Sequence, residues 1–320
     1  MSVTALPMGG GHTGPGSDFA ADAAVPPMLK TSGPSLWRRA KNRLAAVAVV
    51  AAVAVTAIPL VSMIWTAVAR GSQRLDLALF TNSMYGVVGQ GGGLLHALTG
   101  TVLITAATAT ISVPLGLAAA IYLTEYGRGQ LAALTRRAVD VMVSIPSIVA
   151  GLAAYALFSM ILGPGTRSGL AGAVALSIIM VPVVVRSSEE VLAMVPGDLR
   201  EAGLALGAPR YRVIRRIVLP TALPGLTSGA VLGVARIIGE TAPLLLVAGF
   251  TDAMNYNLAD GRMATLPVFI YSQWSSKGLD AAAYDQRAWA GALVLMALVV
   301  VLQVLARALP PQIAKLRRNR

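Results

Sequence analysis

The sequence predicts an all-α polytopic membrane protein with six transmembrane helices, and three observations lead to that fold class. First, 56% of the 320 residues are hydrophobic and only 12% are charged, which is too apolar for an ordinary soluble domain of this length. Second, six apolar runs are each long enough to cross a bilayer. Third, the basic residues gather in alternate segments between these runs, as they do in multi-pass proteins.

The apolar runs define the expected helices. A membrane-spanning helix needs about 20 apolar residues to cross roughly 30 Å of hydrocarbon. Runs of this length lie at residues 44–69, 97–123, 138–162, 168–186, 219–249 and 287–308. The fourth run contains Pro182, which membrane helices tolerate when neighbouring groups satisfy the carbonyl that the proline leaves free. We therefore expect one helix for each run.

The chain in front of these runs has a different composition. Residues 1–36 are rich in Gly, Pro, Ala and Ser and show no hydrophobic period, which is typical of disordered segments. We expect a disordered tail at 1–36 and a transmembrane domain at 37–320, with one large polar loop at about 187–218.

The distribution of Lys and Arg predicts the direction of the helices. If the N-terminus is cytoplasmic, the inside segments hold nineteen of these residues and the outside segments six, with Arg236 left inside a span. Positive charge favours the cytoplasmic side, so both termini and the loop at 187–218 are expected there. This topology also explains the net charge of +12, because a nucleic-acid-binding protein would instead cluster its basic residues on a polar domain. We expect contact with membrane lipid and none with nucleic acid.

Several kinds of chemistry are excluded by what the sequence lacks. It has no cysteine and only two histidines, so we expect no disulfide, no metal site and no metal cofactor. No lysine follows a glycine, so the phosphate-binding loop of ATPases is absent. A hydrolase would need a nucleophile with a base in reach, and no GxSxG motif is present. We therefore predict no catalytic residue and no bound cofactor.

The polar loop contains a short predicted helix. Asp198 and Glu201 have the spacing of a capping box, and Pro209 should end the helix. Small residues fill it, at Ala202, Gly203, Ala205, Gly207 and Ala208. A glycine inside a helix costs about 1 kcal/mol relative to alanine, so we expect the small surface to serve a close contact. That contact is either with a separate partner or with a neighbouring helix of the same bundle.

This loop also carries a family resemblance. The stretch "EAGLALGAPRYRVIRRIVLP" resembles the EAA loop of ABC importer permeases through Glu201, Ala202, Gly203, Gly207, Leu219 and Pro220. The one departure is Gly203, where the family more often has alanine. In that family the short helix is a coupling helix that sits in a groove of a separate ATPase subunit. The resemblance therefore implies ATPase coupling at Asp198, Glu201, Ala202, Gly203 and Gly207.

Four further stretches narrow the resemblance. They are "IPSIVAGLAAY" at 145–155, "VPVVVRSSEEVLAMVP" at 181–196, "ARIIGETAPLL" at 235–245 and "MATLPVFIY" at 263–271. Together they resemble the A-type permeases of phosphate ABC importers (PstA type) in the bacterial inner membrane. The resemblance implies the type I importer (MetI-like) fold. It also implies a C-type phosphate permease, two copies of an ATPase subunit and an extracytoplasmic phosphate-binding protein as partners. Importers of the same fold for molybdate or sulfate are the alternative.

Two charges lie inside the fifth apolar run, at Arg236 and Glu240. Each costs about 2.5 to 3.5 kcal/mol at the centre of a membrane helix, so each needs a reason to be there. Four residues apart, they would share a helix face and could form an internal ion pair, but the order Arg before Glu opposes the helix dipole. A guanidinium fits the oxygens of phosphate. We expect both residues in a translocation path, with Glu240 holding Arg236 when the path is empty and the partner permease adding another Arg.

Overall fold

The computed structural model describes residues 36–278 and 280–318, with side chains described as far as Ala308. Residues 1–35 of the tail that we expect to be disordered lie outside the described residues. Every regular element of the described part is a helix, so the prediction of an all-α protein is confirmed. The chain divides into two units, residues 1–60 and 61–320.

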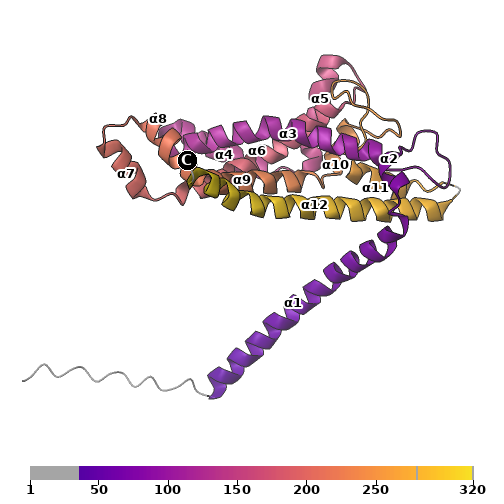
Figure 1. Ribbon diagram of the computed structural model, residues 1–320, viewed down its shortest axis with the longest axis horizontal. Coiled ribbons are helices and arrows are strands. Elements are labelled where there is room, and N and C mark those ends of the chain that lie inside the picture. Colours follow the sequence, from indigo (N-terminus) through magenta and orange to yellow (C-terminus); the bar gives the residue numbers. More distant parts are fainter. Residues whose placement is uncertain (1–35, 279, 319–320) are drawn as a thin grey trace, which may run out of the picture. The chain divides into compact units, whose positions relative to one another are not determined.

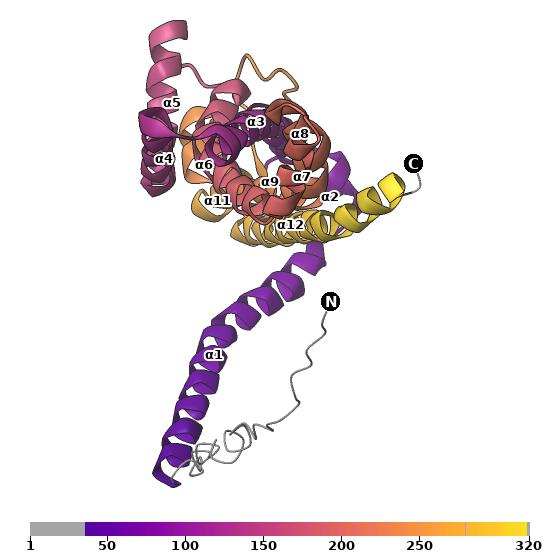
Figure 2. The same cartoon turned by 90° about the vertical axis from the view of Figure 1, so that its left-hand side faces the viewer.

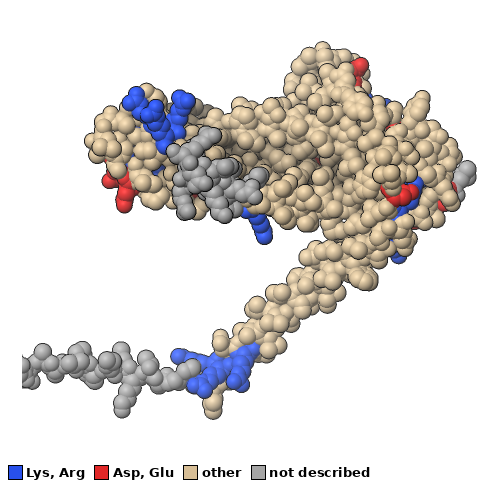
Figure 3. All heavy atoms as spheres, in the orientation of Figure 1, with Lys and Arg blue, Asp and Glu red and all other residues tan. Residues whose placement is uncertain are grey.

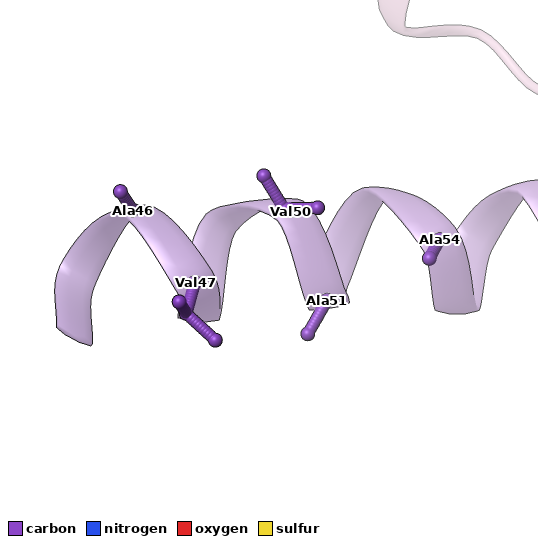
Figure 4. A pocket seen from close by; sticks show the side chains of 5 residues that line it. All are labelled: Ala46, Val47, Val50, Ala51 and Ala54. Atoms are coloured by element: carbon purple, nitrogen blue, oxygen red, sulfur yellow. The ribbon is translucent and has the colours of Figure 1, made fainter. Parts of the chain in front are cut away.

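The described part of the first unit is one helix. α1 (Leu36–Gly71) begins in this unit and carries apolar side chains that are exposed around its whole circumference. Figure 4 shows a shallow hollow that is lined by α1 alone, between Ala46, Val47, Val50, Ala51 and Ala54. The hollow is therefore a gap between side chains of a single helix. A helix that is apolar all round is suited to lipid or to packing against another helix.

In the second unit four long helices run side by side (Figure 1, Figure 2): α3 (Leu95–Ile121), α6 (Gly169–Ala193), α9 (Leu219–Ile237) and α12 (Ala281–Arg318). α6 lies at the centre, where it packs against α3, α9 and α5 (Ser147–Leu162). In its most apolar 18-residue segment, 61% of the residues are buried. In the corresponding segments of the spans that contain α3, α9 and α12, 28%, 28% and 17% are buried. The outer three helices therefore have apolar surface left for lipid or for a partner.

Shorter elements connect the long helices. η1 (Ser72–Arg74) and α2 (Leu77–Thr81) precede α3, and the π-helical turn η2 (Tyr122–Tyr126) ends it. α4 (Gly129–Ser144) precedes α5. Between α6 and α9 lie α7 (Gly197–Ala205), α8 (Arg210–Val213) and the π-helical η3 (Ile214–Val218). α10 (Ala242–Val247) and α11 (Leu266–Ser275) separate α9 from α12.

The expected helix at 138–162 is wrong as a single element. α4 ends at Ser144, α5 begins at Ser147, and their axes differ in direction by 106°. Pro146 explains the break, because proline has no N–H to donate and keeps the preceding Ile145 extended, with ψ at 125°. Among the described residues, five helices can cross a membrane by length and composition, and the bent pair α4 and α5 would make a sixth span.

The expected helix at 219–249 is also broken. α9 ends at Ile237 and α10 begins at Ala242. Pro243 lies at the start of α10, where in a continuous helix its ring would clash with the carbonyl of Gly239 and its missing N–H would leave that carbonyl without a partner. The break leaves Arg236 in the last turn of α9 and Glu240 in the connecting segment.

Charged side chains are few along the middle of one face of the bundle. Figure 3 shows this long face with almost no charge, while Lys and Arg gather near the end that carries α7 and α8 and, separately, at the start of α1. An uncharged belt between polar ends is what a hydrocarbon layer requires of the helices that cross it.

Candidate functional site

The loop helix α7 begins two residues earlier than the predicted capping box requires. Its N-cap is Pro196, and no side chain caps its N-terminus, so the prediction that Asp198 caps this helix is wrong. Pro196 has ψ of 137°, which keeps the chain extended up to Gly197. Asp198 and Glu201 are both exposed, and Asp198 lies in the first turn, where a negative charge interacts favourably with the helix dipole.

The two glycines of this loop have different structural roles. Gly203 is buried, and a Cβ there would lie 2.9 Å from Ile217 Cδ1 and 3.0 Å from Val213 Cγ2. Its small size therefore lets α7 pack on α8 and η3 of the same chain. Gly207 follows the helix with φ of 76°, a left-handed conformation that favours glycine, and a Cβ there would meet nothing within 4 Å. The expectation that Gly207 lies inside the helix is wrong, since it ends the helix.

The outer surface of α7 is apolar rather than merely small. Leu199, Leu204 and Leu206 are 40%, 49% and 88% exposed. Ala202 lies on the exposed surface of the same helix. α7 and the residue that follows it thus leave apolar side chains exposed on the surface of the single chain.

Sequence reasoning missed the residue that holds α7 in place. Arg200 forms an ion pair with Glu125 in η2, with a distance of 2.9 Å from Nη2 to Oε1. The two residues are 75 positions apart, so no spacing rule connects them. The signal available in the sequence was an acidic residue, Glu125, at the end of an otherwise apolar run.

Arg236 and Glu240 do not share a helix face. Arg236 is exposed in the last turn of α9, and Glu240 is half-buried in the break that follows. No ion pair joins them within the part of the chain that the structure describes. The internal pair within one helix, which the four-residue spacing suggested, is therefore not present in this structure.

The break changes the electrostatic meaning of the order Arg before Glu. In a continuous helix this order opposes the dipole. Here Arg236 lies at the C-terminal end of α9, where a positive charge is favoured, and Glu240 lies just before the N-terminal end of α10, where a negative charge is favoured. Each charge is therefore favoured by a separate helix end and does not depend on the other.

Buried neighbours fix the position of this break. Ile237 and Ile238 are 1% and 5% exposed and pack in the core between α3 and α6. Close by, Thr101 of α3 accepts a hydrogen bond from the Leu266 N–H at 2.8 Å, which ties the start of α11 to α3. The backbone is thus anchored on one side, while the Arg236 side chain points away from the core.

The described residues contain no group of three or more His, Asp or Glu side chains that could hold a metal ion. The exposed side chain of Arg236 is a guanidinium, whose paired N–H donors match the oxygens of an anion.

The chain is similar to known inner-membrane transport proteins. The family model of the binding-protein-dependent transport system inner membrane component matches residues 112–315. The phosphate transport system permease protein PstA 1 of Mycobacterium tuberculosis (strain CDC 1551 / Oshkosh) is 41% identical over 275 residues, or 85% of this chain and 89% of that protein. The phosphate transport system permease protein PstA of Pasteurella multocida (strain Pm70) is 41% identical over 254 residues, or 79% of this chain and 88% of that protein.

Two solved structures share the fold. The inward-facing MetNI methionine ABC transporter matches with a TM-score of 0.53 and 22% identity, over 69% of this chain and 94% of that chain. A bacterial alginate ABC transporter, in complex with a periplasmic protein that binds an alginate pentasaccharide, matches with a TM-score of 0.57 and 16% identity, over 88% of this chain and 98% of that chain. At these identities the likeness concerns the fold alone, and it confirms the expected architecture of an ABC importer permease.

Proposed function

This chain belongs to the family of binding-protein-dependent transport system inner membrane components, and from that premise we propose that it is a permease subunit of an ATP-driven phosphate importer. The substrate is inferred from the 41% identity, over 85% of this chain, to a phosphate transport permease. The chain is a transport subunit of the inner membrane, and ATP is hydrolysed by a separate subunit. The alternative substrates molybdate and sulfate gain no support from these relatives.

Two regions of the chain divide the work. α7, with Asp198, Glu201, Ala202 and Gly207 exposed and Gly203 packed beneath it, contacts the ATPase subunit. The break after α9 brings Arg236 to the surface of the single chain, and a charge in a membrane span must face a protein interior or a water-filled path. A second permease subunit therefore covers Arg236, and the translocation path runs between the two subunits.

The proposed assembly completes the phosphate site. Arg236 offers paired N–H donors to the phosphate oxygens, and the negative charge of Glu240, in the break that follows α9, repels the ion and so weakens the site enough for phosphate to leave. Because these two charges are neutral together, a C-type phosphate permease contributes at least one further arginine. Two ATPase copies bind beneath the two permeases, and an extracytoplasmic phosphate-binding protein delivers the ion.

The substrate is tested by uptake and competition. Cells that depend on this chain for the complete importer should take up radiolabelled phosphate, and unlabelled phosphate in excess should suppress that uptake. Molybdate and sulfate in the same excess should leave the phosphate uptake unchanged. Only a site built for one of those oxyanions would bind them in competition with phosphate. Uptake that molybdate or sulfate suppresses as strongly as phosphate does would contradict the assignment.

The direction of the chain is tested by labelling single cysteines. The sequence has no cysteine, so Ser32→Cys and Ser275→Cys each create a single reactive site. Ser275 is exposed at the end of α11, in the segment that the charge distribution places outside. A membrane-impermeant thiol reagent should label the cysteine at 275 in intact cells, and the cysteine at 32 only after the cells are opened. Labelling at 32 in intact cells would invert the topology.

A further inference from the structure

The guanidinium of Arg200 joins three helices at the base of α7. Its Nε and Nη2 donate to Glu125 Oε1 at 3.0 and 2.9 Å. Its Nη1 donates to the Val195 carbonyl at 2.6 Å, and Nη2 also donates to the Leu192 carbonyl at 2.8 Å. Every nitrogen of the group is thus bonded, to the end of α3 through Glu125 and to the end of α6 through the two carbonyls.

The carboxylate of Glu125 lies in unusual surroundings. Its side chain is only 4% exposed, and it lies in η2, a π-helical turn at the end of a membrane-spanning helix. A buried carboxylate is unfavourable unless a positive charge pairs with it, and Arg200 provides that charge. π-helical turns inside α-helices occur frequently at functional sites. The pair therefore fixes the position of α7 relative to the end of α3, because loss of Arg200 would leave the buried carboxylate of Glu125 without a positive charge.

A second contact ties the chain beyond α7 to the same turn of α3. The Arg210 guanidinium lies over the ring of Tyr126, 5.5 Å from its centroid. α3 in turn shares its core with the end of α9, where Ile104 and Ile237 belong to one buried cluster. α3 is thus a single helix that contacts α7 through Glu125 at one end and packs near Ile237, the residue after Arg236, through Ile104.

We propose that Arg200 and Glu125 are a positioning pair that transmits movement of α7 to α3, so that ATP hydrolysis by the bound ATPase stays coupled to phosphate movement. The inference rests on the proposed function, since it assigns these residues a part in that transport. Neither residue touches phosphate or ATP. The pair acts by making α7 and the end of α3 move together, which a loose surface contact between them would not do.

The test compares hydrolysis and transport in the same vesicles. The complete importer, with both permeases, the ATPase and the phosphate-binding protein, is reconstituted, and ATP hydrolysed is divided by phosphate taken up. Coupling between distant sites usually amounts to a factor of about 5 to 150, so Arg200→Ala should raise this ratio by at least roughly 5-fold. Arg137→Ala is the matched control, because Arg137 is exposed on α4 and makes no side-chain hydrogen bond or ion pair with a described residue. It should leave the ratio unchanged.

A double-mutant cycle identifies the pair itself. If Arg200 and Glu125 act through each other, Arg200→Ala combined with Glu125→Ala should raise the ratio no further than Arg200→Ala alone. If Arg200→Ala does not assemble, Arg200→Lys and Glu125→Gln take its place. Arg200→Lys keeps the positive charge but loses the paired N–H donors of the guanidinium. Glu125→Gln keeps the shape of the side chain but loses its negative charge. Each of these two variants should still raise the ratio above that of the unmutated complex.

The outcomes separate the two proposals. If the unmutated complex takes up no phosphate, the proposed function is wrong, whatever Arg200 does. If the unmutated complex transports phosphate and the Arg200 and Glu125 variants lose uptake and hydrolysis in equal proportion, the pair only stabilises the fold and the coupling role is overturned. Additive effects of the two substitutions in the cycle would also overturn it.

Discussion

Arg236→Ala is expected to lower phosphate uptake by roughly 10- to 150-fold, since hydrogen bonds to a charged group contribute about 1.5 to 3 kcal/mol. The phosphate ion loses hydration as it crosses the membrane, and the paired donors of a guanidinium replace part of it. Arg236 is exposed at the end of α9 and has no ion pair with Glu240 in the described structure, so Glu240 does not occupy its donors. Uptake of radiolabelled phosphate by the assembled importer measures the effect.

Three variants make this result specific. Arg236→Lys keeps the positive charge but loses the paired N–H donors of the guanidinium. Its rate of phosphate uptake should therefore lie between the rates of the unmutated protein and of Arg236→Ala. Glu240→Gln should have a milder effect than Arg236→Ala, because it removes a repulsion rather than a ligand. Arg307→Ala removes an exposed arginine in the C-terminal half of α12 and should transport normally. Uptake at the unmutated rate by a fully assembled Arg236→Ala complex would exclude Arg236 from the path.

The helices with unbroken apolar runs were predictable because their signal is local. A run of about 20 apolar residues must be buried in lipid or protein, and helix is the structure that satisfies its backbone there. The effect of a proline was not predictable in the same way. Pro114 and Pro182 lie inside α3 and α6, which continue through them, whereas Pro146 breaks the third run. Whether neighbouring groups replace the lost hydrogen bond is decided by packing, which one sequence does not reveal.

Among the site residues, too, local features were predictable from the sequence and features that depend on tertiary packing were not. The sequence pattern correctly predicted a short helix in the polar loop, whereas the shared helix face of Arg236 and Glu240 was wrong. The functions of Gly203 and Gly207 could not be separated from sequence, because one depends on a tertiary contact with Val213 and the other on a backbone angle. The pair of Arg200 and Glu125 arises only when the ends of α3 and α6 come together. Tertiary contacts thus supply what spacing rules omit.

The break in the fifth run changes the electrostatic effect of the order of Arg236 and Glu240. With a continuous helix, the order of Arg236 and Glu240 is a cost that a transport role must justify. With the break, each charge is favoured by its own helix end, so the order supports holding the two charges apart. Separation suits a path, because an arginine locked to a carboxylate would have fewer donors left for an anion.

Leu206→Asp is expected to separate the permease from its ATPase, with the loss of both phosphate uptake and ATPase co-purification. Leu206 is 88% exposed at the end of α7, and burying a leucine in an interface contributes about 1.5 to 3 kcal/mol. Aspartate removes that contribution and adds a charge that the interface would bury without a partner. The affinity should therefore fall by more than roughly tenfold.

A matched variant distinguishes docking from folding. Leu206→Met keeps an apolar side chain of similar volume and should bind the ATPase and transport normally. Gly207 is a poorer probe, since a side chain there would strain the left-handed backbone by about 1 to 2 kcal/mol and disturb the end of α7 itself. Because Leu206 touches so little of its own chain, Leu206→Asp should insert and pair with the second permease as the unmutated protein does. Normal co-purification of the ATPase with Leu206→Asp would show that the apolar surface of α7 is not where the ATPase binds, and the coupling role would then have to lie elsewhere on the cytoplasmic side.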